Sequence, residues 1–234
     1  MRYAIYYTPP EDSALVRTAS AWLGRDAFSG RAVPHPSVER LTLAEIRHHT
    51  GAARRYGFHA TLKAPFRLKE GRNEAELIAA LDRFAAFLKP FPVALEVGRV
   101  RGFFALTPKG ENEPLDRLAA DVIGAFEPFR APLTKADIAR RNPDRLSPEE
   151  LKNLHQWGYP HVFDTFRFHM TLTGPVEPAE SAAVEAALKR LFEPELGEPV
   201  IFSGLALFVE EEAGAPFVIR SLHPFGKQDA RRSA

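Results

Sequence analysis

The chain has 234 residues, of which 45% are apolar and 26% are charged, as in an ordinary soluble globular protein. Its formal net charge is +1, which argues against a surface that binds long nucleic acid by neutralising phosphates. The absence of cysteine excludes disulfides, thiol catalysis and cysteine-based zinc or iron–sulfur sites.

The N-terminal segment turns polar after Tyr7 without a long apolar run, and no stretch of about 18 apolar residues follows it. We therefore expect no signal peptide, no membrane contact and a cytoplasmic location. The oligomeric state is left open by the sequence.

Apolar spacing and turn residues predict the secondary structure in chain order. Strands are expected over residues 2–8, 56–65, 93–97, 101–107, 163–175, 200–209 and 216–222. Helices are expected over residues 11–23, 42–48, 73–88, 114–126 and 177–192. The polar stretch 131–158 is expected to be a loop that contains short helices.

One ten-residue stretch occurs twice in the sequence. Tyr56 to Pro65 reads YGFHATLKAP, and Phe166 to Pro175 reads FRFHMTLTGP, 110 residues later. In each copy a predicted strand is followed by a helix and then by two further strands. A period this long does not fit a solenoid, and it favours two related lobes that face each other. Strands that come in hairpin-like couples favour antiparallel sheets.

The predicted fold is therefore α+β and bilobal. We expect pseudo-twofold duplicated lobes of largely antiparallel sheet, with helices outside and an active-site groove between the lobes. Residues 1–225 are expected to form one bilobal catalytic domain with one His-x-Thr motif in each lobe. Residues 226–234 are small, polar and basic, so we expect them to be a disordered tail.

The repeated stretch has one polar face and one apolar face, because residues i and i+2 of a strand point to the same side. His59 and Thr61 share one face, and His169 and Thr171 share the corresponding face of the second copy. The opposite faces are apolar and are assigned to the core: Phe58, Ala60, Leu62, Phe168, Met170 and Leu172.

Two such faces across a groove would combine two imidazoles with hydroxyl and cationic side chains. Histidine titrates near neutral pH, so one ring can accept a proton from a nucleophile while the other donates one to the leaving oxygen. We predict a phosphate site with acid–base catalysis that requires no metal and no cofactor, with His59 and His169 as the catalytic pair. The phosphoryl oxygens are expected to be held by Thr61, Thr171, Lys63 and Arg167.

A single His-x-Thr would be weak evidence of catalysis, because a lone histidine in a strand is more often structural. Two copies in matching contexts favour the catalytic interpretation. One alternative is a non-catalytic protein that binds nucleotides or RNA ends in the same groove. Another is a metallohydrolase, although neither motif has a third histidine or a carboxylate at short spacing.

The duplicated motif, His59-Ala60-Thr61-Leu62 and His169-Met170-Thr171-Leu172, resembles that of the two-histidine phosphoesterase superfamily. The opening MRYAIYYTPP and the segments RRYGFHATLKAPF and FRFHMTLTGP resemble a branch of uncharacterised proteins associated with bacterial phosphonate-utilisation operons. The resemblance covers nearly the whole chain. It implies hydrolysis of a small cyclic or linear phosphodiester, such as a cyclic ribose phosphate or a 2′,3′-cyclic nucleotide. It leaves open which histidine is the base.

Other side chains could contact the substrate. Arginines and a tyrosine precede the first motif, and the tyrosines of residues 3–7 could stack on a ring, although aromatic residues in a strand more often belong to the core. The basic and aromatic segment 131–161 could form a lid or a polar loop that merely packs on its lobe. The residues that we expect to bind substrate are Arg54, Arg55, Tyr56, Tyr7, Thr173 and Tyr159.

Overall fold

The structure is a computed structural model that describes residues 1–226. In this part of the chain seven antiparallel strands form one sheet in the order β4-β5-β6-β2-β1-β8-β9, and the short strands β3 and β7 pair with each other. The prediction of an α+β fold with a largely antiparallel sheet is confirmed. The strands are β1 Arg2–Tyr7, β2 Ala60–Phe66, β3 Phe91–Val93, β4 Leu95–Val100, β5 Phe103–Pro108, β6 Met170–Pro175, β7 Val200–Phe202, β8 Gly204–Glu210 and β9 Val218–Pro224.

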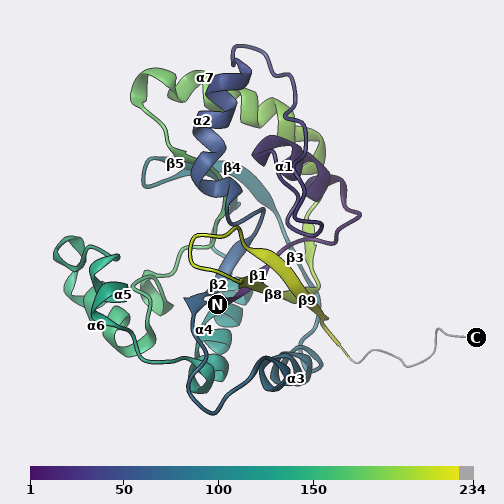
Figure 1. The fold of residues 1–234 in the computed structure, drawn as a ribbon. Helices are drawn as coiled ribbons and strands as arrows, with labels where there is room; N and C mark the ends of the chain where they lie inside the picture. The colour runs from purple at the N-terminus through teal and green to yellow at the C-terminus, as the bar shows by residue number, and fades with distance from the viewer. Residues whose placement is uncertain (227–234) are drawn as a thin grey trace, which may run out of the picture.

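The helices lie around the sheet, with α1, α2 and α7 at one end of the molecule and α3 and α4 at the other (Figure 1). Capping boxes start α2, α3, α5 and α6, where a side chain before the helix and one in its first turn satisfy free backbone N–H groups. The helices are α1 Ala14–Leu23, α2 Leu43–Arg54, α3 Glu74–Ala85, α4 Glu113–Phe126, α5 Lys135–Ala139, α6 Pro148–Trp157 and α7 Pro178–Phe192. Short 3₁₀ turns are η1 Glu127–Phe129, η2 Pro143–Arg145, η3 Phe163–Thr165 and η4 Glu193–Glu195.

An approximate two-fold axis passes between the central strands β2 and β6. On one side of the axis the order is β6-β5-β4, and on the other it is β2-β1-β8, with β9 added at the edge. The short strands β3 and β7 precede β4 and β8, and they also pair across the axis, with Pro92 opposite Ile201. The predicted pseudo-twofold arrangement is therefore present in the order of the strands.

Each half of the sheet nevertheless takes strands from both copies of the repeat. The sequence order suggests that the strands after each motif stay in the lobe of that motif. Instead β4 and β5 follow the first motif and join β6, whereas β8 and β9 follow the second motif and join β1. Helix α3 packs on β8 and β9, and α7 packs on β4. The two halves are thus interlocked and share one continuous sheet.

Two apolar clusters lie on opposite faces of the sheet. The larger cluster joins one face to helices α1, α2, α3, α4 and α7. The smaller cluster lies on the other face of β1 and β8, beside the histidine of the first motif, and contains Ala4, Tyr6, Ala27, Ala206, Phe208 and Phe217.

Within residues 1–226, no helix combines the length and apolar character needed to cross a membrane. The tail expected at 226–234 lies outside the described residues apart from Gly226, whose backbone N–H donates to the Ala85 carbonyl at 3.1 Å. The division into a domain of residues 1–225 and a tail stays a prediction.

Candidate active site

The two His-x-Thr motifs meet at the centre of the sheet. Strands β2 and β6 pair antiparallel with Ala60 opposite Met170. Continuing this register by one residue on either side places His59 beside Thr171 and Thr61 beside His169. Neighbours on one face of an antiparallel pair have Cβ atoms about 5 Å apart. The two motifs therefore form a quartet of two imidazoles and two hydroxyls on one face.

The opposite face of both strands is apolar, as predicted. The six residues assigned to the core are all buried there, with exposed fractions of 6% or less. They belong to the larger cluster and anchor β2 and β6 from behind: Phe58, Ala60, Leu62, Phe168, Met170 and Leu172. Burying one face of each strand fixes which side the histidines occupy, because a slip of one residue would reverse the faces.

Both histidines are oriented in the same way by the backbone. The Nδ1 atom of His59 lies 2.9 Å from the Gly57 carbonyl oxygen, and that of His169 lies 2.7 Å from the Arg167 carbonyl oxygen. A carbonyl oxygen only accepts hydrogen bonds, so Nδ1 carries the proton in each neutral ring. This leaves Nε2 of each ring free for proton transfer, and the Thr61 hydroxyl lies 3.3 Å from Nε2 of His59.

Gly57 has a conformation that this geometry requires. Its φ of +76° lies in the left-handed region, which favours glycine. A Cβ atom at this position would approach the Ala27 Cβ to 2.5 Å. The turn ends α2 and begins the motif segment, and it presents the Gly57 carbonyl to the His59 ring. It also delays the strand, which begins at Ala60 rather than at the predicted residue 56.

The surroundings of the two rings favour their neutral forms. Burial lowers the pKa of His59 to about 4, and the neighbouring His169 adds to this effect. The His59 ring stacks on Tyr6, with ring centroids 3.9 Å apart. Burial, together with the charge of Arg101, also lowers the pKa of His169. His169 is less enclosed than His59, which is only 9% exposed.

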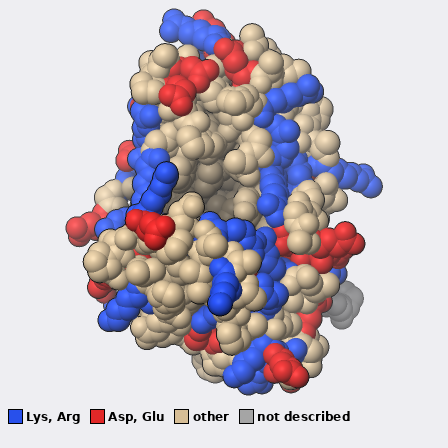
Figure 2. Space-filling view, turned by 60° about the vertical axis from the view of Figure 1, so that its left-hand side comes forward, with Lys and Arg blue, Asp and Glu red and all other residues tan. Residues whose placement is uncertain are grey.

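A small cavity of about 260 Å³ opens beside the quartet, and we call it the histidine cavity. His59, Thr61 and Thr171 line it, whereas His169 is not among its lining residues. The face drawn in Figure 2 is hollowed, and Lys and Arg side chains gather around the hollow. Arg2 and Arg141 line the histidine cavity itself, so anions are favoured there. The residues that line it are Arg2, Tyr6, Ala52, Ala53, Tyr56, His59, Thr61, Ala64, Pro65, Arg141, Tyr159, Thr171 and Thr173.

Three of the expected substrate-binding residues line the histidine cavity. Tyr56 stacks on Phe217 beside His59, and Tyr159 reaches the cavity from the segment after α6. Thr173 also lines it, but its hydroxyl already accepts a hydrogen bond from the Phe104 N–H at 2.9 Å. Tyr56 and Tyr159 are therefore better placed than Thr173 to contact a ligand.

The two cations expected to hold phosphate do not line the histidine cavity. The ammonium of Lys63 is buried and donates to the Glu127 carboxylate at 2.9 Å and to the Ile123 carbonyl at 3.3 Å. Arg167 is exposed, and its guanidinium donates to backbone carbonyls within its own turn, including that of Asp164 at 2.9 Å. For Lys63 the strand alternation also breaks, because the pairing of β1 with β2 shifts register between Thr61 and Lys63 and places Lys63 opposite Ile5 of the larger apolar cluster.

The three other residues expected to bind substrate do not line the histidine cavity. Arg54 donates to the Leu23 carbonyl at 2.7 Å and ties the end of α2 to α1. Arg55 pairs with Glu210 and lines a neighbouring, larger cavity. Tyr7 lies on the other face of β1, in the larger apolar cluster, so its ring does not line the histidine cavity.

Arg2 and Arg141 line the histidine cavity although they were not among the residues expected to bind substrate, and Tyr6 lines it in place of the expected Tyr7. Tyr6 lies opposite Thr61 across β1 and β2, which puts its ring on the side of the quartet. The alternation of β1 separates Tyr6 from Tyr7, but the sequence does not reveal which one faces the quartet. Arg141 belongs to the segment 131–161, which therefore forms part of the cavity wall.

The part of the chain that the structure describes contains no group of three or more His, Asp or Glu side chains placed to hold a metal ion. The metal-free mechanism expected from the motifs stays a prediction, which a chelator experiment can test.

The chain belongs to the protein family described as "Protein of unknown function (DUF1045)", which matches residues 61–218. It is 38% identical, over 99% of its length, to a protein of Janthinobacterium sp. (strain Marseille) named ribose 1,5-bisphosphate phosphokinase PhnN. It is 39% identical, over 93% of its length, to the protein of that name from Laribacter hongkongensis (strain HLHK9). The matches cover 52% and 50% of those two proteins, so the chain spans about half the length of these curated relatives.

A crystal structure of a phosphoesterase also resembles this chain, with a TM-score of 0.41 and 12% sequence identity. The match covers 97% of this chain and 99% of that one. A similarity this weak carries no conclusion about activity.

Proposed function

We propose that this member of the family is a phosphodiesterase of the two-histidine type, which hydrolyses a small cyclic or linear phosphodiester without a metal ion. The observation that carries the proposal is the quartet. Two imidazoles with Nδ1 bound to backbone carbonyls lie on one face with two threonine hydroxyls. Such a pair can take one proton from the attacking water and donate one proton to the leaving ester oxygen during hydrolysis.

The two histidines differ enough to assign them different roles. His59 has a pKa of about 4, so it is neutral near pH 7, and its Nε2 can accept a proton from the attacking water. The water oxygen bonds to phosphorus as the ester P–O bond breaks. His169, when protonated, donates from Nε2 to the leaving ester oxygen. A bound phosphodiester anion would favour this protonated form of His169.

The remaining polar groups of the histidine cavity suit the phosphoryl oxygens. The hydroxyls of Thr61 and Thr171 flank the two rings, and Arg2 and Arg141 also line the cavity. These groups can hold the two non-bridging oxygens as their charge increases. The ring of Tyr56 or Tyr159 can pack against a sugar.

The substrate that we propose is a phosphorylated sugar or nucleotide, such as a cyclic ribose phosphate or a 2′,3′-cyclic nucleotide. A cavity of about 260 Å³ suits a small molecule rather than a long polymer. The curated relatives are named for a phosphorylated ribose, which supports this class. A role in phosphonate metabolism is part of the same proposal, through the resemblance of the motif segments.

The kinase activity in the name of the relatives is not part of the proposal. The chain spans about half of their length and contains no GxxxxGK[ST] loop of the kind that cradles nucleotide phosphates. We assign the kinase activity to the portion of the relatives that this chain does not match.

The direct test is ring opening in the presence of excess EDTA. We expect the protein to convert 2′,3′-cyclic nucleotides or a cyclic ribose phosphate to monoesters at the same rate with and without the chelator. Mass spectrometry of the products gives both the rate and the bond that breaks. Complete loss of activity on chelation would contradict the metal-free mechanism, and tight binding without turnover would favour the non-catalytic alternative.

The assigned roles also predict an acidic pH optimum. As pH rises through about 4, His59 loses its proton and becomes a competent base, so kcat/KM should increase. As pH rises further, His169 loses the proton that it must donate, so kcat/KM should decrease again. Because burial lowers the pKa of His169 from its ordinary value of 6.5, this decrease should begin at a pH below 6.5. The measurement is kcat/KM from pH 3.5 to 8, with circular dichroism to verify folding. An optimum above pH 7 would contradict the assignment.

A further inference from the structure

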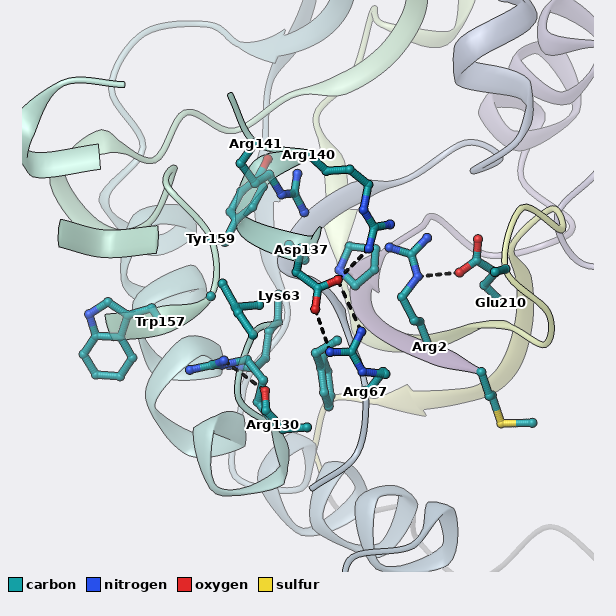
Figure 3. Close-up of a pocket in the computed structure, with 18 of the residues that line it drawn as sticks. Arg2, Lys63, Arg67, Arg130, Asp137, Arg140, Arg141, Trp157, Tyr159 and Glu210 are labelled. Carbon is teal, nitrogen blue, oxygen red and sulfur yellow. Dashed lines mark hydrogen bonds and ion pairs between the residues drawn. The ribbon is translucent and has the colours of Figure 1, made fainter. Parts of the chain in front are cut away.

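A second and larger cavity adjoins the histidine cavity, and the mechanism above does not use it. Its volume is about 640 Å³, and we call it the basic cavity. One wall comes from β1, β2 and β8, and the other from the segment that contains α5 and α6 (Figure 3). The two cavities adjoin, because six residues line both of them: Arg2, Tyr56, Ala64, Pro65, Arg141 and Tyr159.

The basic cavity has a large excess of positive charge. Among residues 1–226, seven Lys and Arg side chains line it and three carboxylates pair with them, which leaves a formal excess of four positive charges. The whole chain has a net charge of only +1, so the excess is local. The seven cations are Arg2, Arg55, Lys63, Arg67, Arg130, Arg140 and Arg141.

Each carboxylate holds two of these cations in place. In Figure 3, Asp137 lies between Arg67 and Arg140, and it bonds to Arg67 at 2.6 Å and to Arg140 at 2.5 Å. The Arg67 guanidinium keeps the pKa of Asp137 well below its usual range, so the carboxylate stays charged. Glu210 holds Arg2 and Arg55, and Glu127 holds Lys63 and Arg130.

Arg141 differs from the other six cations. No carboxylate of residues 1–226 pairs with its guanidinium, which lies 4.9 Å from the ring centroid of Tyr159. It lines both cavities and is half-buried. A cation held by an aromatic ring and otherwise free can bind an anion at the junction of the two cavities.

We infer that the basic cavity binds a phosphate monoester group of the same substrate whose phosphodiester lies in the histidine cavity. This inference rests on the proposed function and narrows its substrate to phosphodiesters of a sugar that carries a second, terminal phosphate. A monoester dianion matches the local charge excess better than a neutral group does. Arginine guanidinium groups also bind phosphate oxygens in a bidentate way.

The two sites adjoin closely enough for one small molecule, because six residues line both cavities, among them Arg2 and Arg141. Arg2 lies beside Arg67 at the end of β2, because Tyr3 pairs with Phe66. Arg140 precedes Arg141 in the chain and lines the basic cavity. A phosphodiester in the histidine cavity and a second phosphate of the same molecule can therefore lie on either side of Arg141, with the second phosphate near Arg140.

Binding of two nucleotides that are not phosphodiesters tests the inference separately from catalysis. By isothermal titration calorimetry, we expect adenosine 3′,5′-bisphosphate to bind at least about tenfold more tightly than adenosine 3′-monophosphate, because the second phosphate adds charge-assisted hydrogen bonds. Equal affinities, or failure of the bisphosphate to bind, would overturn the inference. The proposed function fails by a different result, which is the absence of ring opening.

A pair of matched arginine variants locates the second phosphate. Arg140→Gln should remove most of the preference for the bisphosphate, because Arg140 lines only the basic cavity. Its partner Asp137 stays paired with Arg67, and Arg140 is largely exposed, so folding should not suffer. Arg117→Gln is the control, since Arg117 also pairs with a carboxylate of its own helix but lines neither cavity. A preference that survives in Arg140→Gln would overturn the inference.

Discussion

Replacing His59 or His169 with glutamine is expected to lower kcat for a cyclic phosphodiester by about 10²–10⁴-fold in each case, because positioned acid–base groups contribute factors of this size. Glutamine is preferred to alanine at position 59, since that ring is buried against Tyr6 and a smaller side chain would leave a cavity. Single-turnover kinetics on purified variants give the rate of the chemical step.

The two histidines should also act as a unit. A double variant is expected to lose little more activity than either single variant, since neither ring alone completes the transfer of both protons. His48→Gln is the matched control, because His48 is an exposed histidine of α2 that lines neither cavity. Full activity in both single variants would refute the role of the quartet.

The quartet could be predicted from the sequence because strand alternation is a local rule. His59 and Thr61 must share a face if residues 59–61 are extended, and the apolar residues between and beside them identify the core side. The repeat then implies that the second motif has the same arrangement. The structure adds the pairing of Ala60 with Met170, which brings the two polar faces together.

Long side chains were less predictable than the quartet. The pairing of β1 with β2 shifts register between Thr61 and Lys63, so Lys63 lies opposite Ile5 of the larger apolar cluster, and its buried ammonium needs a carboxylate partner. That partner, Glu127, lies 64 residues later in the chain and just after α4. Strand alternation contains no information about such a distant partner, so the expected contact with phosphate at the quartet could not be judged from sequence.

The N-terminal strand shows a second limit. Both faces of β1 are buried, one in each apolar cluster, so its sequence has no alternation of polar and apolar residues. The choice between Tyr6 and Tyr7 depends on the register of β1 with β2, which only the fold provides. The sequence also does not reveal that β4 and β5 join β6 while β8 and β9 join β1. Pairing within one lobe and pairing between the two halves satisfy the same local patterns of residues.

The second prediction with a large effect concerns the threonines of the quartet. Thr61→Val and Thr171→Val remove a hydroxyl while keeping the branched shape of the side chain. Each is expected to lower kcat/KM by about 10²–10³-fold, the loss seen when one donor to a developing oxyanion is removed. Thr107→Val is the control, since Thr107 is also a strand threonine but lines neither cavity. Steady-state kinetics on a cyclic phosphodiester measure the loss.

The two threonine variants should differ in one respect. The Thr61 hydroxyl lies 3.3 Å from Nε2 of His59 and can donate to its lone pair, which favours the neutral ring. Removing this hydroxyl should raise the pKa of His59, so that the acidic limb of kcat/KM moves to higher pH in Thr61→Val. No such contact joins Thr171 to His59 within residues 1–226, so that limb should stay in place in Thr171→Val. Equal shifts in both variants would contradict the assignment of His59 as the base.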